Sequence, residues 1–340
     1  MSFRVAVVGA TGLVGNEMLR VLEERSLPLS CVIPLATSRS SGSRVSFRKE
    51  ELIVEDVEAF DFSRVDLALF AGGEIASKDY ASRAVQAGAV VIDNSSAFRM
   101  DPEVPLVVPE VNACSLVQHQ GIVANPNCST IQMVMVLKPL VDKVGLRRVI
   151  VTTFQSVSGT GKDAITELET QTRALMDGQR PERRVYPHRI AFNLFPQIGS
   201  FGLLGYCEEE WKMIKETQKI LNHPDLAVTA TTVRVPVVRG HSESLLVETE
   251  RPITCEEAVE ILSGFDGVRV MDQNTYPVPE EAAGRDEVFV GRIRQDTSSP
   301  NGLHMWVVAD NIRKGAALNA VQIAEVMCDM GLLQEKAEKS

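Results

Sequence analysis

The sequence predicts an α/β fold in which a doubly wound parallel sheet is followed by an α+β domain with a largely antiparallel sheet. Three observations predict it. Apolar strands alternate with amphipathic helices over the first third of the 340 residues. A glycine-rich turn joins the first of these strands to the first helix. Beyond about residue 149 the alternation gives way to long β-rich runs with few helices between them.

The first domain is expected to begin with a strand over residues 4–9, a nearly continuous apolar run typical of strands buried on both faces. Met18, Leu19 and Leu22 then form one stripe of a helix expected over residues 16–25. The remaining expected elements are strands within 31–36, 66–72, 90–95 and 121–126, a helix over 76–89 and a proline-containing loop over 100–111. This order favours parallel strands joined by crossovers.

The second domain is expected to contain most of the remaining β structure. Its strands are expected within 147–157, 227–238, 242–253, 287–296 and 302–311, and its helices within 162–178 and 254–264. The turn sequence DTSSPN separates the last two strands and favours an antiparallel pair. An amphipathic helix within 315–333 can return to the first domain. We therefore expect one domain of residues 1–128 completed by residues 315–340, and a second of residues 129–314.

Composition and charge narrow the class of protein. The chain carries a net charge of −10 with a pI near 5.2, which argues against general binding to nucleic acid. No apolar run reaches the length that spans a membrane, and the N-terminal residues lack the features of a signal peptide. The six cysteines show no metal-like spacing, so we expect reduced thiols and no bound metal. These features favour a cytoplasmic protein.

The turn after the first strand reads VVGATGLVGNEM and spaces Gly9, Gly12 and Gly15 three residues apart. Glycines at such a turn permit close approach of the backbone to a ligand, and the N-terminus of the following helix attracts a pyrophosphate. A simple packing turn is the alternative. The position directly after the first apolar strand favours a dinucleotide and hence a Rossmann-like domain.

The end of the second strand indicates which dinucleotide is bound. Enzymes that use NAD usually have an acidic residue there, which holds the ribose hydroxyls. This sequence instead reads TSRSSG, in which Ser38 and Arg39 suit a 2′-phosphate. Arg39 can also be an ordinary solvated loop charge, but the sequence favours NADP.

Cys128 is the strongest candidate nucleophile. It follows the turn ANPN and directly precedes Ser129 and Thr130, which are good first residues for an apolar helix. The dipole and free N–H groups at a helix start favour a thiolate and can stabilise an oxyanion formed when the sulfur attacks a carbonyl. The alternative is a small buried thiol at a strand–helix junction, but a polar turn favours the nucleophile.

His241 and Arg234 form the second candidate pair, in the sequence RVPVVRGHSESLLVE. An arginine fork suits a carboxylate, and a histidine beside it suits proton transfer. The spacing alone does not distinguish a functional role of this pair from a purely structural role. A further small-residue loop, FQSVSGTG, begins with Gln155 at a strand end, where it can orient a substrate. Ser158 and Gly159 in that loop leave room for a ring or a phosphate, unless they form a plain turn.

Seven stretches, found in order between about residues 4 and 330, together resemble aspartate-semialdehyde dehydrogenase of the shorter bacterial type. They are VAVVGATGLVG, SSAFRMDPEVPLVVPEVN, NPNCSTIQM, FQSVSGTG, EEEWKMIKETQKIL, RVPVVRGHSES and DNIRKGAALNAVQIAE. The motif NPNCST is far more specific than the glycine loop. The resemblance implies that the second domain is catalytic and mediates dimerisation.

The resemblance also implies roles for individual residues. Cys128 matches the nucleophile that forms an acyl-thioester, and His241 matches the acid/base. The implied substrate-binding residues are Gln155, Arg234 for the α-carboxylate, Glu209 for the amine, and Asn127. The implied phosphate-binding residues are Arg99 and Lys212. The implied NADP contacts are Gly9, Thr11, Gly12, Leu13, Val14, Ser38, Arg39, Ser158, Gly159 and Asn311.

The implied reaction interconverts L-aspartyl 4-phosphate with L-aspartate 4-semialdehyde and phosphate, using NADP, and supplies lysine, threonine and methionine biosynthesis. The implied assembly is a homodimer or a dimer of dimers. One alternative is a related acyl-phosphate reductase of the N-acetyl-glutamyl-phosphate type, although that family differs around its cysteine, where this chain has Asn127 and Ser129. Another is a non-catalytic NADP-binding sensor, which would be expected to lose the cysteine or the histidine.

Overall fold

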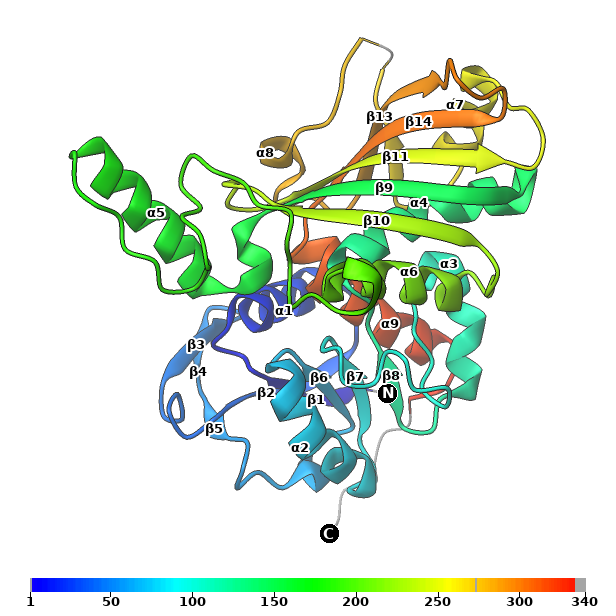
Figure 1. Cartoon of the computed structure of the whole chain (residues 1–340). Coiled ribbons are helices and arrows are strands. Elements are labelled where there is room, and N and C mark those ends of the chain that lie inside the picture. Colours follow the sequence, from blue (N-terminus) through cyan, green and yellow to red (C-terminus); the bar gives the residue numbers. More distant parts are fainter. Residues whose placement is uncertain (1, 273, 334–340) are drawn as a thin grey trace. The chain divides into compact units, whose positions relative to one another are not determined.

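The computed structural model describes residues 2–272 and 274–333 (Figure 1). The chain forms two compact units, Met1–Asn127 with Ala316–Ser340, and Cys128–Gly315. Each unit is built around its own six-stranded sheet. Within the described ranges, no helix combines the length and the apolar character needed to cross a membrane.

The first unit contains a fully parallel sheet, as the alternation of strands and helices predicted. Its strands lie in the order β5-β2-β1-β6-β7-β8. Their bounds are β1 Phe3–Val8, β2 Leu29–Ala36, β5 Glu55–Asp56, β6 Leu67–Phe70, β7 Val90–Asp93 and β8 Ile122–Ala124. The predicted doubly wound parallel sheet is therefore confirmed.

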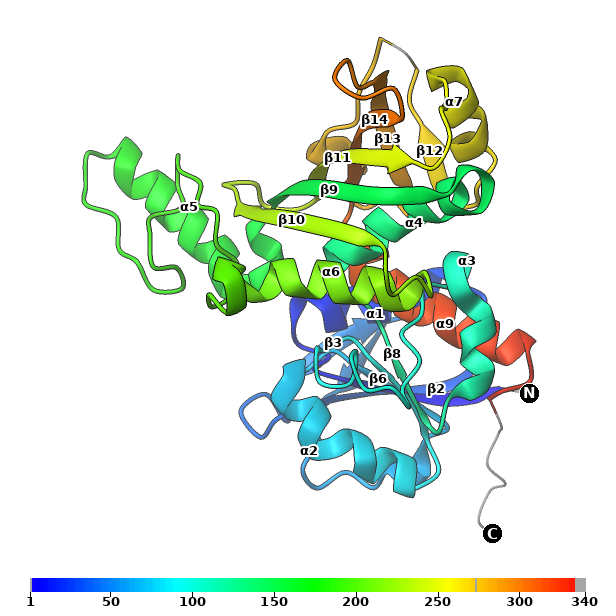
Figure 2. The same cartoon turned by 45° about the vertical axis from the view of Figure 1, so that its right-hand side comes forward.

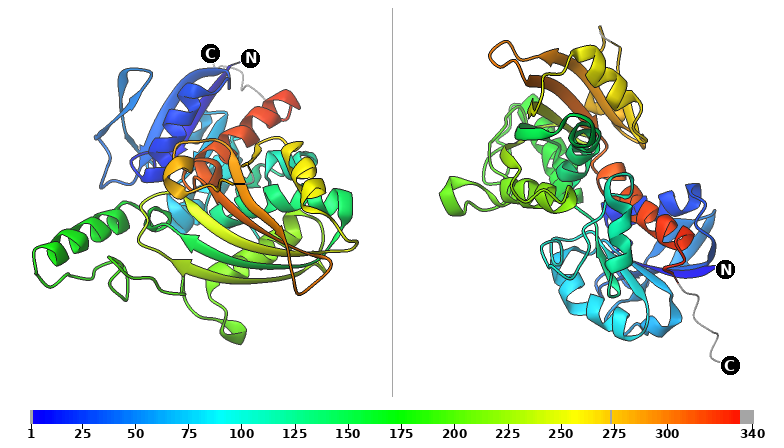
Figure 3. Two further views of the ribbon diagram at one scale, coloured as in Figure 1. Left: turned by 90° about the horizontal axis from the view of Figure 1, so that it is seen from above. Right: turned by 90° about the vertical axis from the view of Figure 1, so that its right-hand side faces the viewer.

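Helices cover both faces of this sheet. On one face α1 (Leu13–Glu24) and α9 (Leu318–Asp329) lie side by side (Figure 3). Their Met18, Leu22 and Val321 pack with β-strand residues in one apolar core. On the other face, α2 (Gly73–Gln86) packs through Ala81 and Ala84 in a second core. The short helix α3 (Pro109–Asn112) falls at the end of the proline-containing loop.

A small hairpin in the first unit was not predicted. Its strands are β3 (Arg44–Phe47) and β4 (Glu50–Ile53). The two turn residues, Arg48 and Lys49, both have positive φ angles of 48° and 67°. Two-residue hairpins with such a turn usually carry Asn-Gly or Asp-Gly, so a turn of two basic residues gives no signal in the sequence.

The second unit contains a mixed, largely antiparallel sheet in the order β10-β9-β11-β14-β13-β12. The strand bounds are β9 Leu146–Gln155, β10 Ala227–Arg234, β11 His241–Thr249, β12 Val268–Val270, β13 Val288–Gln295 and β14 Gly302–Ala309. The three inner pairs are antiparallel, as predicted. At the two edges, β10 runs parallel to β9 and β12 runs parallel to β13, which was not predicted.

Helices α4 (Cys128–Val144), α6 (Glu208–Ile220) and α7 (Cys255–Ser263) pack against this sheet, with α6 running beside β10 (Figure 2). Helix α6 was not predicted, because its many charged residues hide a narrow apolar stripe that includes Met213 and Ile214. Helix α5 (Lys162–Met176) forms a separate small core through Ala164 and Leu168, and α8 (Pro279–Ala282) precedes β13.

Candidate active site

Cys128 is the first residue of α4, and its side chain is half-buried. The chain makes room for it with a glycine: a Cβ on Gly315 would lie only 2.9 Å from the Cβ of Cys128. The start of a helix has free backbone N–H groups and carries the positive end of the helix dipole. Both features favour an ionised, reactive thiol. Asn127, the residue before it, is buried.

Three strands bring three of the predicted side chains to one edge of the second sheet. The parallel strands β9 and β10 end opposite one another at Gln155 and Arg234. The antiparallel neighbour β11 begins at the same edge with His241. All three side chains are at least nine-tenths buried. Residues separated by up to 86 positions in the chain therefore converge because of strand pairing.

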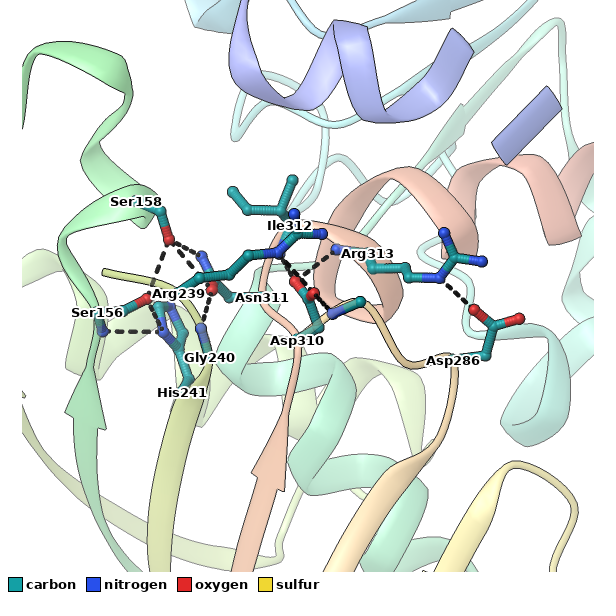
Figure 4. Close-up of polar contacts among 11 residues, drawn as sticks. Ser156, Ser158, Arg239, Gly240, His241, Asp286, Asp310, Asn311, Ile312 and Arg313 are labelled. Carbon is teal, nitrogen blue, oxygen red and sulfur yellow. Dashed lines mark hydrogen bonds and ion pairs between the residues drawn. The ribbon is translucent and has the colours of Figure 1, made fainter. Parts of the chain in front are cut away.

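The two ring nitrogens of His241 have different surroundings. Nδ1 accepts a hydrogen bond from the backbone N–H of Ser156 at 3.1 Å and lies 3.1 Å from the Ser156 hydroxyl (Figure 4). Nε2 is buried and has no hydrogen-bond partner among the described residues. A backbone N–H can only donate, so the neutral ring carries its proton on Nε2.

The His241 ring stays neutral over the physiological range. Burial, followed by the positive charge of Arg234, lowers the pKa of His241 to about 3, and Glu209 and the Gly240 backbone oppose this only in part. His241 is thus a neutral N–H donor, rather than an imidazolium that has already taken up a proton. That state suits an acid that donates to an oxygen as negative charge develops on it.

Arg234 is fixed beside this ring. Its Nη1 donates a 2.6 Å hydrogen bond to the backbone carbonyl of Ser156, and its guanidinium lies 5.9 Å from the centre of the Tyr186 ring. Gly159 lies over both groups, since a Cβ there would be 3.4 Å from His241 Nε2 and from Arg234 Nη1. The loop after β9 therefore packs closely over the histidine and the arginine, where a side chain would contact both.

Gln155 connects the cysteine helix to α6. Its Nε2 donates to the hydroxyl of Ser129, the residue next to Cys128, and to Glu209 Oε1 at 3.0 Å. Lys212 lies one helical turn from Glu209, with its Nζ 3.4 Å from the carboxylate. The side-chain amide oxygen of Gln155 is buried without a partner among the described residues. One face of the site thus holds an amide, a carboxylate and an ammonium group.

Asn311 is buried and acts as a bridge within the second unit (Figure 4). Its Oδ1 accepts hydrogen bonds from the Gly240 N–H at 2.9 Å and from the Ser156 hydroxyl at 3.1 Å. Its Nδ2 donates to the Ser158 hydroxyl at 3.0 Å. The predicted cofactor contact thus uses both polar atoms of its side chain inside the protein, next to the residues that hold His241.

The glycine loop of the first unit has the shape its sequence predicted. Gly9 has a φ of +84°, and a Cβ there would lie 2.7 Å from Gly72 Cα. A Cβ on Gly15 would lie 2.1 Å from the Gly9 carbonyl oxygen, so neither position accepts a side chain. Thr11 and Gly12 are exposed at the start of α1, and the next two residues, Leu13 and Val14, are half-buried.

Ser38 and Arg39 lie exposed in the turn after β2, and Arg99 lies buried elsewhere in the first unit. Arg99 donates to the backbone carbonyls of Asn125 at 3.0 Å and Asn94 at 2.7 Å. Over residues 2–272 and 274–333, no cluster of three or more histidine, cysteine or acidic side chains has an arrangement that could hold a metal ion.

Comparison with known proteins identifies the family. Residues 4–119 match the model described as semialdehyde dehydrogenase, NAD binding domain, and residues 137–314 match semialdehyde dehydrogenase, dimerisation domain. The aspartate-semialdehyde dehydrogenase of Legionella pneumophila is 53% identical over 329 residues, 95% of each chain. That of Aquifex aeolicus is 52% identical over 98% of this chain and all of its own. The chain belongs to the aspartate-semialdehyde dehydrogenase family.

Solved structures of aspartate-semialdehyde dehydrogenases agree with this. Aspartate semialdehyde dehydrogenase II of Vibrio cholerae, complexed with ASA, is 48% identical and superposes with a TM-score of 0.95 over 97% of this chain and 99% of its own. The Candida albicans enzyme with NADP is 25% identical, with a TM-score of 0.78 over 98% of this chain and 100% of its own. The enzyme class predicted from the sequence is confirmed, and the chain has a nicotinamide-cofactor domain of this family.

Reasoning from the sequence alone missed two residues of this aspartate-semialdehyde dehydrogenase site. Ser156 holds His241 through its backbone N–H, and a backbone contact leaves no trace in residue type. Gly315 leaves room for Cys128 because it has no Cβ, but it lies in a stretch that the sequence predicted only as helix. Both are recognisable only in the folded structure.

Proposed function

We propose that this chain is the NADP-dependent enzyme that converts L-aspartyl 4-phosphate to L-aspartate 4-semialdehyde through an acyl-thioester on Cys128, for lysine, threonine and methionine biosynthesis. One observation carries the proposal. Gln155, Arg234 and His241 converge at one sheet edge, and Gln155 donates a hydrogen bond to the residue beside Cys128.

The substrate is proposed to bind through complementary charges. Arg234 is a buried cation whose guanidinium suits the α-carboxylate. Glu209, a buried carboxylate that already accepts from Gln155, suits the substrate amine. Gln155 has a buried amide oxygen available to accept a hydrogen bond from a donor group of the substrate, and Asn127 is assigned to the same pocket. An N-acetylated substrate has no charged amine, so Glu209 favours aspartate derivatives over the N-acetyl-glutamyl alternative.

The first chemical step is acyl transfer. The Cys128 thiolate attacks the acyl carbon, so that a C–S bond forms and the C–O bond to phosphate breaks. The N–H groups at the start of α4 suit the oxyanion of the tetrahedral intermediate. Phosphate leaves with both bonding electrons, and Arg99 and Lys212 are proposed to stabilise its charge.

Reduction then releases the product. When bound, NADPH supplies a hydride to the thioester carbon. The Nε2–H of His241 is suited to donate to the oxygen as it gains negative charge. The oxyanion, held by this hydrogen bond, then re-forms the C=O bond as the C–S bond breaks, which frees the aldehyde and regenerates the Cys128 thiolate. His241 is thereby unchanged after each cycle.

The residues of the first unit fit a dinucleotide, and they favour NADP. Gly9 and Gly15 have no room for side chains, which brings backbone N–H groups within reach of a pyrophosphate at the start of α1. Leu13 and Val14 follow in that helix. Ser38 and Arg39 are exposed after β2, where no acidic residue stands to repel a 2′-phosphate. In the second unit, Ser158, Gly159 and Asn311 are proposed as further contacts.

The assembly is proposed to be a homodimer, or a dimer of dimers, formed through the second unit. Alternate residues of its sheet point away from α4, and Ile150, Phe154, Leu246 and Trp306 on that face are half-exposed. The rings of Phe154 and Trp306 lie 5.5 Å apart on neighbouring parts of this face. Burying them against a second copy is favourable. The cytoplasm is the proposed location.

The test measures the formation of NADPH from aspartate semialdehyde and NADP⁺, with and without phosphate. The absorbance of NADPH is the signal. Phosphate-dependent formation supports the proposal, because only acyl transfer from a thioester consumes phosphate. Formation that ignores phosphate contradicts it. If aspartate semialdehyde gives nothing while N-acetyl-glutamate semialdehyde reacts, the related reductase is the correct assignment. If the folded protein binds NADP⁺ but neither aldehyde reacts, it is a sensor.

A further inference from the structure

Glu243 is a carboxylic acid that the reaction proposed above does not use. It lies in the inner strand β11 and is fully buried. Its neighbours across the sheet are Thr153 on β9 and Val307 on β14. An ionised carboxylate in such a position would require a cation or several hydrogen-bond donors. Neither cross-strand neighbour supplies a charge.

A layer of buried polar side chains lies one step behind the predicted active-site residues. Each member is one structural repeat from such a residue: Gln132 from Cys128 on α4, Glu243 from His241 on β11, and Thr153 from Gln155 on β9. Side chains four apart on a helix, or two apart on a strand, share a face. The layer therefore backs the site from all three elements that build it.

The polar atoms of this layer show that Glu243 has no charged partner. Neither carboxylate oxygen of Glu243, neither amide atom of Gln132, nor the Thr153 hydroxyl has a hydrogen-bond partner within ordinary distance among the described residues. Burial raises the pKa of Glu243 well above its usual value, and the nearby Gln132 amide lowers it only in part. Along β11, His241 is neutral because its pKa is about 3.

We propose that Glu243 is a positioning residue, which remains a neutral carboxylic acid and links β11 to α4 through Gln132. A neutral carboxyl group can donate to the amide oxygen and accept from the amide nitrogen, so the two side chains complement one another without any charge. The link holds the helix that begins at Cys128 against the strand that begins at His241. Its neutral state is independent of the proposed function, whereas its effect on catalysis rests on that function.

The first test measures the effect of pH on thermal stability. In the unfolded chain Glu243 ionises above about pH 4.5, so wild-type stability falls as pH rises toward the higher folded-state pKa. Glu243→Gln is permanently neutral and escapes this loss. Its melting temperature should rise relative to wild type by about 3 °C per pH unit above about pH 5. Glu248→Gln, on the half-buried face of the same strand, is the control for the same substitution elsewhere on β11.

Three results of this test would refute the proposal that Glu243 remains a neutral carboxylic acid. They are a Glu243→Gln protein that fails to fold, one that is less stable than wild type at neutral pH, or a stability difference that is flat across the range. None of them is compatible with a carboxylic acid that a neutral amide of the same size can replace. Because the measurement needs no substrate, its outcome stands even if the proposed reaction is wrong.

The second test separates positioning from simple packing. Glu243→Leu removes the polar link at similar volume and should lower kcat by roughly 10- to 100-fold with little change in KM, because misplaced reacting groups slow chemistry more than binding. Glu243→Gln should keep kcat within about twofold of wild type. If Glu243→Leu retains full kcat, or if the glutamine variant loses as much as the leucine variant, the positioning role is refuted.

Discussion

The backbone N–H of Ser156 donates to Nδ1 of His241 at 3.1 Å, and this single contact fixes which nitrogen of the ring can carry the proton. Because the N–H group cannot accept, the proton of the neutral ring lies on Nε2. That nitrogen is the one near Gly159, on which a Cβ would lie 3.4 Å from it. The backbone at the end of β9 therefore sets the tautomer that the proposed role of His241 requires.

We predict that His241 stays neutral, with its proton on Nε2, down to about pH 3. Nitrogen-15 NMR of histidine-labelled protein reports the tautomer directly, and His241→Asn assigns the signal. In the unfolded chain the ring ionises near its ordinary pKa of 6.5, so folding loses stability as pH falls below that value. The His241→Asn variant should lose less stability than wild type between about pH 6 and about pH 4. A His241 signal that titrates near pH 6.5, or that shows a protonated Nδ1, would contradict the prediction.

Cys128→Ala should reduce turnover by at least about a thousandfold while NADP⁺ binding remains close to wild type, because only the acyl-thioester needs the sulfur. Initial rates and cofactor titration on the same preparation measure the two effects. Cys114→Ala removes an exposed thiol outside the site and provides the control. Substantial activity in Cys128→Ala would refute the thioester route.

Gly315→Ala should disturb catalysis through Cys128 alone. The added Cβ would approach the Cys128 Cβ to 2.9 Å, so the cysteine or the backbone must shift. We expect kcat to fall by roughly 10- to 100-fold. The measurement is kcat, together with the rate at which a thiol reagent labels Cys128. Gly264→Ala, whose Cβ would meet only ordinary contacts starting at 3.5 Å, should leave both unchanged. If kcat and the labelling rate are the same in Gly315→Ala and Gly264→Ala, the structure accommodates the added Cβ without affecting Cys128, and the prediction is wrong.

Arg39→Ala should weaken NADPH binding more than NADH binding, since only NADPH carries a 2′-phosphate for the exposed guanidinium. We expect a loss of about tenfold for NADPH and almost none for NADH, measured as KM or Kd for each cofactor. Arg44→Ala, an exposed arginine of the neighbouring hairpin, serves as the charge-matched control. An equal loss of affinity for both cofactors would mean that Arg39 does not contact the 2′-phosphate.

Much of the fold could be predicted because local patterns are strong where burial is complete. The apolar run of β1, the glycine turn and the stripe of α1 each carry their own signal. The missed elements are those without such signals. The turn of the β3–β4 hairpin consists of two basic residues, and α6 begins with three glutamates, Glu208, Glu209 and Glu210. Three acidic residues in a row suggest a solvated loop, although their charge also stabilises a helix start.

The candidate site was predictable in residue type but not in arrangement. Cys128, His241 and Arg234 stand out because of their chemistry at strand or helix ends. Their convergence depends on β10 lying parallel to β9, and a strand's partner is set by tertiary packing that no local pattern encodes. The Ser156 contact and the Glu243 layer follow from the pairing of β9 with β11 and were likewise hidden. Their roles remain predictions for the experiments above.

The parallel pairing of β9 and β10 has a further consequence for how this enzyme can vary. A chain that leaves one parallel strand must travel back along the sheet before it enters the next, so residues 156–226 form a long detour containing α5 and α6. Gln155 is the last residue of β9 and Arg234 the last residue of β10, and the pairing of the two strands places them opposite one another. Insertions or deletions within α5 are thus expected to leave the facing positions of Gln155 and Arg234 unchanged. Helix α6 belongs to the same detour but carries Glu209, which Gln155 contacts, so its position must be kept.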